Sequence, residues 1–150
     1  MFNLFKKPKV VYAHCDIPCG IYDPHEAQLS VLTVIRMMDL IADSEDDHDT
    51  ARYIAVKEAH AEKCKHEIRV MWGDYFKEEH IEEYPELHDL THRIMALGSK
   101  VKQNTEREVA EELLGAVNEF AEIFWKTKGV EIKKIKAPYG PEEEVFYPDL

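Results

Sequence analysis

A short stretch near the start of the chain, HCDIPCGIYDP, gathers residues that can bind a metal ion. It places an imidazole and two thiols within six residues, at His14, Cys15 and Cys19. Such ligands suit zinc, copper or nickel. A structural zinc site would need further protein ligands, usually a second Cys or His pair, and the sequence contains no CxxC pair. A disulfide between the two cysteines would close only a small loop and would stabilise the fold little.

The neighbouring residues strengthen the interpretation as a metal site. Pro18 and Gly20 flank the second thiol; proline fixes φ, and glycine allows the backbone to approach a ligand closely. We therefore expect a compact hook with both sulfurs turned inward, tied to a first helix at Asp23 and Pro24. Two thiolates and backbone nitrogens would form a planar set, which is typical of Ni(II) or Cu(II) rather than zinc.

The elements that must position this hook are predicted from hydrophobic periodicity. Apolar residues recur at steps of three, four and seven, which is typical of amphipathic helices. Four such helices with short connections predict an all-α, up-and-down four-helix bundle. The last residues, 130–150, contain three prolines without a helical period, so we expect an irregular, extended arm that is either a surface tail or packs on a neighbouring subunit. The predicted helices cover about residues 24–42, 50–76, 85–102 and 105–128.

Charge and composition exclude several classes of partner. The net charge of −11 argues against nucleic acid and against an anionic membrane surface, since both require clustered Lys and Arg. No apolar run approaches the roughly 18 residues that span a bilayer. The first residues, MFNLFKKPKVVYA, lack the apolar core of a secretory signal, so we expect a cytoplasmic protein. The third cysteine, Cys64, falls on an apolar stripe and is expected to be a buried thiol.

The hook closely resembles the nickel-binding hook of the nickel superoxide dismutase family. Three further stretches agree with that family in order and spacing: MWGDYFK, YPELH and IFWKTK. The resemblance covers about residues 9–129. It implies a four-helix bundle assembled as a homohexamer, with a nickel ion that cycles between Ni(II) and Ni(III). The implied activity is the conversion of superoxide to oxygen and hydrogen peroxide.

The resemblance also implies how the site is made. Residues 1–13 would be a leader, removed by a protease that cuts between Ala13 and His14, and residues 14–129 would form the working domain. Nickel would then be held by the free amine and the axial imidazole of His14, by the backbone nitrogen of Cys15, and by the thiolates of Cys15 and Cys19.

Further roles follow from the same resemblance. Tyr22 matches the family's gate over the open face of the metal, and Lys77 would lie at the entrance. Loss of the leader would take the net charge from −11 to −14, so rapid capture of an anion would need a local positive patch. The supporting residues are Asp16, Pro18, Asp74 and Tyr75. Outside these roles, Trp72 is expected in the core and His88 as a structural hydrogen-bonding residue.

The chain departs from the family at two positions. A helix-one carboxylate and a helix-two guanidinium steady the axial imidazole in the family, whereas Ser30 and His60 occupy those positions here. This departure favours an alternative, a non-catalytic nickel- or copper-binding bundle that acts as a metal store or sensor. A thiol oxidoreductase that uses Cys15 and Cys19 is a third hypothesis, but it lacks the expected CxxC.

Overall fold

The computed structural model describes residues 20–150. The predicted leader and its cleavage site precede this part of the chain. The hook residues also lie outside the described residues; they are His14, Cys15, Asp16, Pro18 and Cys19.

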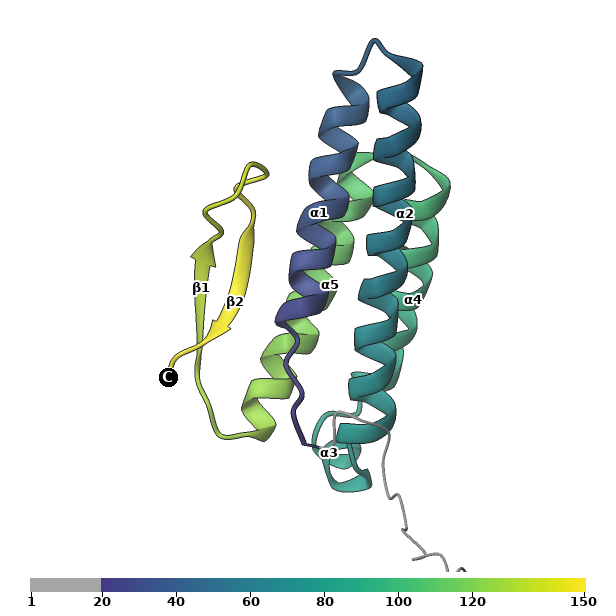
Figure 1. Ribbon diagram of the computed structural model, residues 1–150. Helices are drawn as coiled ribbons and strands as arrows, with labels where there is room; N and C mark the ends of the chain where they lie inside the picture. The colour runs from purple at the N-terminus through teal and green to yellow at the C-terminus, as the bar shows by residue number, and fades with distance from the viewer. Residues whose placement is uncertain (1–19) are drawn as a thin grey trace, which may run out of the picture.

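Four long helices form the body of the molecule and run alternately in opposite directions (Figure 1). The first of these helices packs against the second and the fourth, and the third packs against the same two, which closes the bundle. The predicted up-and-down four-helix bundle is therefore confirmed. The helices are α1 (His25–Ala42), α2 (Asp47–Val70), α4 (Leu87–Gln103) and α5 (Arg107–Thr127).

The beginning of α2 was predicted slightly too late. The helix starts at Asp47 because the carboxylate of Asp46 accepts a hydrogen bond of 2.9 Å from the backbone N–H of Asp49. An aspartate in this position satisfies an N–H group that the helix itself leaves unpaired. In the sequence, the acidic residues before α2 break the helical pattern. One of them, Asp46, is thus the cap of the helix.

The end of α2 departs from regular α-helix. Residues Met71–Tyr75 form a π-helical turn, η1, in which the N–H of Phe76 donates to the carbonyl of Met71 at 3.2 Å. A π turn adds one residue to a helical turn, and such turns are frequent at functional sites. A short helix that was not predicted, α3 (Glu78–Glu83), then leads toward α4.

The core lies between the four helices and consists mainly of aliphatic and aromatic side chains. Phe120 and Phe124 of α5 are fully buried, and Cys64 of α2 lies among the same set of side chains. Burial raises the pKa of Cys64 to about 12, so this thiol stays protonated and unreactive at neutral pH. The expectation of a buried thiol is confirmed.

One lysine is buried in the bundle. Lys57 of α2 is 1% exposed, and its ammonium donates hydrogen bonds to the carbonyls of Val101 (2.5 Å), Lys102 (3.2 Å) and Asn104 (2.6 Å). These carbonyls belong to the end of α4, where the last carbonyl groups of a helix have no N–H donor within the helix. A cation at this end also interacts favourably with the helix dipole. Lys57 therefore caps α4 from a neighbouring helix.

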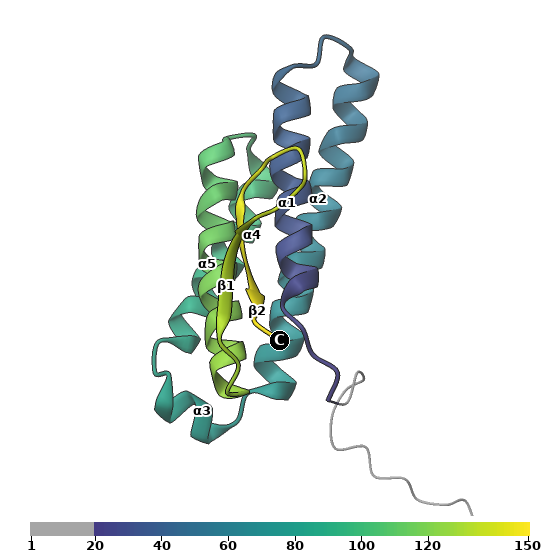
Figure 2. The same ribbon diagram turned by 90° about the vertical axis from the view of Figure 1, so that its left-hand side faces the viewer.

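The C-terminal arm is not irregular, and that expectation was wrong. It forms a two-stranded antiparallel hairpin of β1 (Ile132–Lys136) and β2 (Glu144–Pro148), in which Lys134 pairs with Phe146. The hairpin lies across α1 and α5 of its own chain (Figure 2). The prolines did not prevent strands because Pro138 and Pro141 lie in the connection and Pro148 ends β2. Within residues 20–150, none of the helices is long and apolar enough to cross a membrane.

Candidate functional site

The described chain enters the bundle through a short turn before α1. Gly20 has a φ of +96°, a conformation that favours glycine, and no described atom lies near the place where its side chain would be. The glycine is therefore needed for backbone conformation, rather than for close approach to the described residues. The carboxylate of Asp23 accepts a 2.8 Å hydrogen bond from the N–H of His25. Asp23 thus pairs with the first N–H group of α1, while Pro24 holds the N-cap position.

Tyr22 and Tyr75 come together although 53 positions separate them in the chain. Their ring centroids are 5.7 Å apart and the rings are tilted by 52°, which is a favourable separation for an aromatic pair. Tyr22 lies three positions after Cys19, and Tyr75 ends the π turn. The contact therefore joins the chain that follows the predicted hook to the end of α2.

Tyr75 is held from several sides. Its ring packs on Phe124, with centroids 4.7 Å apart, and stacks on His80 at 5.6 Å with an interplanar angle of 11°. Its hydroxyl shares a 2.7 Å hydrogen bond with Thr127. Because the Thr127 hydroxyl also donates to the carbonyl of Phe124 at 2.7 Å, it must accept the proton of Tyr75. Tyr75 is thus a fixed support for Tyr22.

Two ammonium groups lie near Tyr75. The side chain of Lys77 turns back and donates to the carbonyl of Asp74 at 2.7 Å. The ammonium of Lys128 lies 4.7 Å from the centre of the Tyr75 ring, within the range of a cation–π interaction. Sequence reasoning singled out Lys77 but missed Lys128, Thr127 and His80. Thr127 and Lys128 lie within the IFWKTK motif, three and four positions after Phe124, which places them on the same helix face as Phe124.

A polar pocket of about 240 Å³ opens beside this cluster. Tyr22 and Asp23 contribute one part of its lining, and His66, Glu67 and Met71 of α2 and η1 contribute another. The pocket therefore lies directly beside the point where the described chain begins. It combines an imidazole, two carboxylates and a phenol around a space large enough for small molecules.

The two positions at which the chain departs from the family do not interact with each other. Ser30 is buried, and its hydroxyl donates to the carbonyl of Glu26 at 2.8 Å. His60 makes a 2.9 Å hydrogen bond with the carbonyl of Val56. Each side chain therefore serves its own helix. An ion pair between α1 and α2 is found one turn away, where Lys63 contacts Glu26 at 2.5 Å and its hydrogen bond lowers the pKa of that carboxyl.

The expectation for Trp72 was wrong, and the one for His88 is confirmed. Trp72 is 40% exposed, whereas Met71 beside it in the π turn is buried. Its indole N–H donates to Nδ1 of His88 at 3.0 Å. Both residues therefore join η1 to the first turn of α4.

The donor set of the hook fits nickel chemically. Two thiolates, an imidazole and backbone nitrogen are soft or borderline ligands of the kind that nickel and copper take. Among residues 20–150, no group of three His, Cys, Asp or Glu side chains is arranged to hold a metal ion.

Comparisons with known proteins agree on one family. The family model for nickel-containing superoxide dismutase matches residues 9–128. The Superoxide dismutase [Ni] of Streptomyces coelicolor is 38% identical over 126 residues, covering 84% of this chain and 96% of that protein. The Streptomyces seoulensis protein of the same name is 40% identical over 129 residues, with coverages of 85% and 98%. A crystal structure of a nickel-containing superoxide dismutase with oxidised-state ligation has a TM-score of 0.74 at 38% identity, covering 77% of this chain and 99% of that one.

Proposed function

The chain belongs to the nickel-containing superoxide dismutase family, and on that premise we propose that it converts superoxide to oxygen and hydrogen peroxide. The observation that carries the proposal is that the hook HCDIPCGIYDP is complete and lies within the matched residues 9–128. The packing of Tyr22 on Tyr75 supports it, because this contact ties the end of the hook sequence to the bundle.

We assign the ligands to the hook. His14 would contribute its amine and imidazole, and Cys15 and Cys19 their thiolates, with the backbone nitrogen of Cys15 completing the set. Nickel bound there would supply the electron transfer by alternating between Ni(II) and Ni(III), with the anionic sulfur donors stabilising the higher state. Cleavage between Ala13 and His14 is part of the proposal, because it creates the free amine.

The chain's own residues would control access. Tyr22 would shape the opening over the hook, with Asp16 and Pro18 fixing the hook itself. Tyr75 restrains Tyr22 through ring packing, and its own hydroxyl proton is committed to Thr127. The Tyr75 hydroxyl is therefore suited to positioning rather than to proton delivery.

The ammonium groups of Lys77 and Lys128 would attract the anionic substrate. A chain with a net charge of −11 repels superoxide on average, so a local positive field at the opening would raise the rate of association. The hydrogen bond from Lys77 to the Asp74 carbonyl and the contact of Lys128 with Tyr75 hold both charges near the aromatic cluster.

The assembly and the location of the protein remain proposals. We propose a homohexamer, by analogy with the family, and a cytoplasmic location, from the lack of an apolar signal core in the leader sequence. Light scattering or analytical ultracentrifugation of the trimmed, nickel-loaded protein would test the hexamer.

The function is tested by measuring superoxide decay after pulse radiolysis. The trimmed protein loaded with nickel should remove superoxide catalytically, whereas the same protein loaded with zinc should not, because zinc has no accessible second oxidation state. Equal rates with the two metals, or no rate above the metal-free protein, would contradict the proposal.

A metal store is the second candidate, and the residues Ser30 and His60 favour it. Because both side chains bond to their own helices, neither supplies the charged pair that the family uses. Electron paramagnetic resonance separates the two candidates. A rhombic Ni(III) signal with nitrogen hyperfine splitting would favour the enzyme, whereas a protein that remains silent Ni(II) would favour the store.

A further inference from the structure

The C-terminal hairpin makes its most specific contacts at the start of α1. The side chain of Gln28 is 1% exposed, and its amide donates to the carbonyl of Phe146 at 2.9 Å and to the side-chain oxygen of Asn118 at 3.0 Å. Asn118 in turn donates to the carbonyl of Glu144 at 2.9 Å. These buried amides join α1, α5 and β2. Buried polar groups are costly unless they are paired, so this arrangement fixes where β2 lies.

The end of β2 reaches the first residue of α1. The ring of Tyr147 lies 5.0 Å from the ring of His25, centre to centre. Nδ1 of His25 is buried and has no hydrogen-bond partner among residues 20–150, so packing on Tyr147 is important for the position of this ring. Burial, and then the nearby charges of Tyr139 and Asp23, raise the pKa of Tyr147. Tyr147 thus lies against the residues through which the chain enters α1.

The hairpin is additional to the family pattern. The match to the family model ends at residue 128, and β1 begins at Ile132. The first turn of a helix is prone to opening because its N–H groups lack partners within the helix. In this chain the hairpin covers that turn, and the turn follows the predicted ligand Cys19 by only a few residues.

We propose that the C-terminal hairpin is a brace for the metal hook, in which Tyr147 and Gln28 fix the first turn of α1 and so hold the ligand segment ready for nickel. This inference rests on the proposed nickel site. Residues outside the ligand shell that orient ligands commonly change metal affinity by about 10–100-fold when they are replaced. Tyr147 and Gln28 are positioning residues, since neither belongs to the ligand set.

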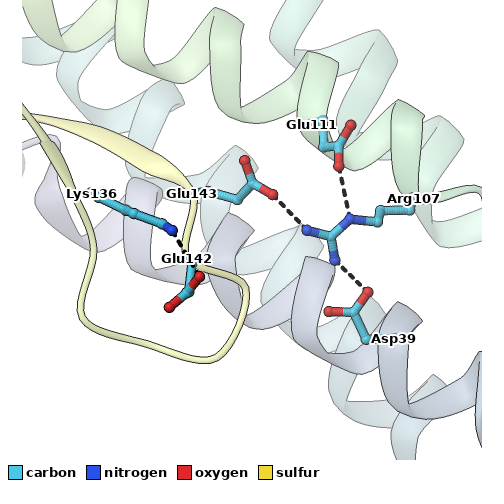
Figure 3. Close-up of polar contacts among 6 residues, drawn as sticks. All are labelled: Asp39, Arg107, Glu111, Lys136, Glu142 and Glu143. Atoms are coloured by element: carbon cyan, nitrogen blue, oxygen red, sulfur yellow. Dashed lines mark hydrogen bonds and ion pairs between the residues drawn. The ribbon is translucent and has the colours of Figure 1, made fainter.

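The other end of the hairpin supplies a matched control. There Arg107 of α5 contacts Glu143 at 2.5 Å and Glu111 at 2.8 Å, and it also pairs with Asp39 (Figure 3). This cluster joins the hairpin to the opposite end of α1, far along the helix from His25. Arg107→Gln should therefore loosen the hairpin without disturbing the start of α1.

The first test measures nickel affinity of the trimmed protein by competition with a chelator. Tyr147→Ala should weaken nickel binding by about tenfold, at the lower end of the range for residues that orient ligands. Tyr147→Phe, which keeps the ring, should stay within about twofold of wild type, and so should Arg107→Gln. An unchanged affinity in Tyr147→Ala, or an equal loss in Arg107→Gln, would overturn the brace.

The second test does not depend on the metal. Hydrogen exchange of the full chain without nickel should be faster over residues 23–28 in Tyr147→Ala, and unchanged there in Arg107→Gln. Should Tyr147→Ala fail to fold, Gln28→Met carries the same expectation, because it removes the amide donor while keeping the volume. If wild type binds no nickel, the proposed function fails, whereas exchange that is the same in wild type and variant would refute the brace itself.

Discussion

The bundle and the C-terminal hairpin are held in place by different interactions. The bundle is held by a continuous apolar core in which the side chains of α5, including Phe120 and Phe124, are fully buried. The hairpin and its connection add only Ala137 and Val145 to this core, and the hairpin depends on the Gln28 amide bonds for its position. The bundle should therefore fold without the hairpin, whereas the hairpin should not fold alone, since two-stranded hairpins are marginal in water.

The difference also separates what is shared from what is particular to this chain. The bundle and hook lie within the family match, and the hairpin lies beyond it. We therefore expect changes in the hook to abolish the chemistry without unfolding either region, and changes in the hairpin contacts with α1 to alter how firmly the hook is held.

The largest effect is expected at the hook. Cys15→Ser and Cys19→Ser should each reduce nickel-dependent superoxide removal to background, because an alcohol does not replace a thiolate as a soft anionic donor. The thiolate-to-nickel absorption should disappear as well. Far-ultraviolet circular dichroism should match wild type, and activity retained in either variant would remove the hook from the mechanism.

Core truncations should separate the two regions by stability. Phe124→Ala should lower the free energy of unfolding by about 3–5 kcal/mol, the usual cost of truncating a buried aromatic side chain. Val145→Ala should cost roughly 1–2 kcal/mol, because it removes only two methyl groups from a site at the edge of the core. Urea unfolding measures both, and equal losses would show that the hairpin belongs to the same cooperative core.

A smaller effect is expected for the buried cation of the bundle. Lys57→Met should destabilise the protein by about 1–3 kcal/mol at neutral pH, because the carbonyls of Val101 and Asn104 lose their donor. Burial lowers the pKa of Lys57 below its ordinary value of 10.5. The folded state then binds fewer protons than the unfolded state, so this lysine adds stability as the pH rises toward 10.5. Urea midpoints from pH 7 to 10 should show the wild type gaining on the variant, and parallel curves would contradict the assignment.

The smallest effect should appear in substrate capture, and the hairpin offers its control. Lys77→Glu should slow superoxide removal by a few-fold at low salt and much less at high salt, since charges are screened within about 10 Å at 0.1 M. Lys134→Glu makes the same change of charge on the hairpin, where the lysine lies over Phe146, and should slow it less. Equal slowing by both would mean that only net charge matters.

The sequence carries enough information for the bundle, because its helices are long and their apolar periods are regular. It also predicts the hook, because a histidine and two cysteines so close together suit a metal ion and match the motif of one family. The hairpin was missed because its strands are short and prolines lie at Pro138, Pro141 and Pro148. The proposed brace was not predictable, since Gln28 meets Phe146, and His25 meets Tyr147, only after α1, α5 and β2 have packed. The support of Tyr75 by Thr127 and Lys128 likewise depends on tertiary packing.

We expect the hook to work only when His14 begins the chain. While Ala13 is attached, the nitrogen of His14 is an amide and a poor ligand, so the full chain should be inactive although its helices are formed. The measurement is superoxide removal by one preparation, with nickel present throughout, before and after cleavage between Ala13 and His14. We predict that activity appears only after cleavage. Equal activity before and after would contradict it, because the free amine would then not be a ligand.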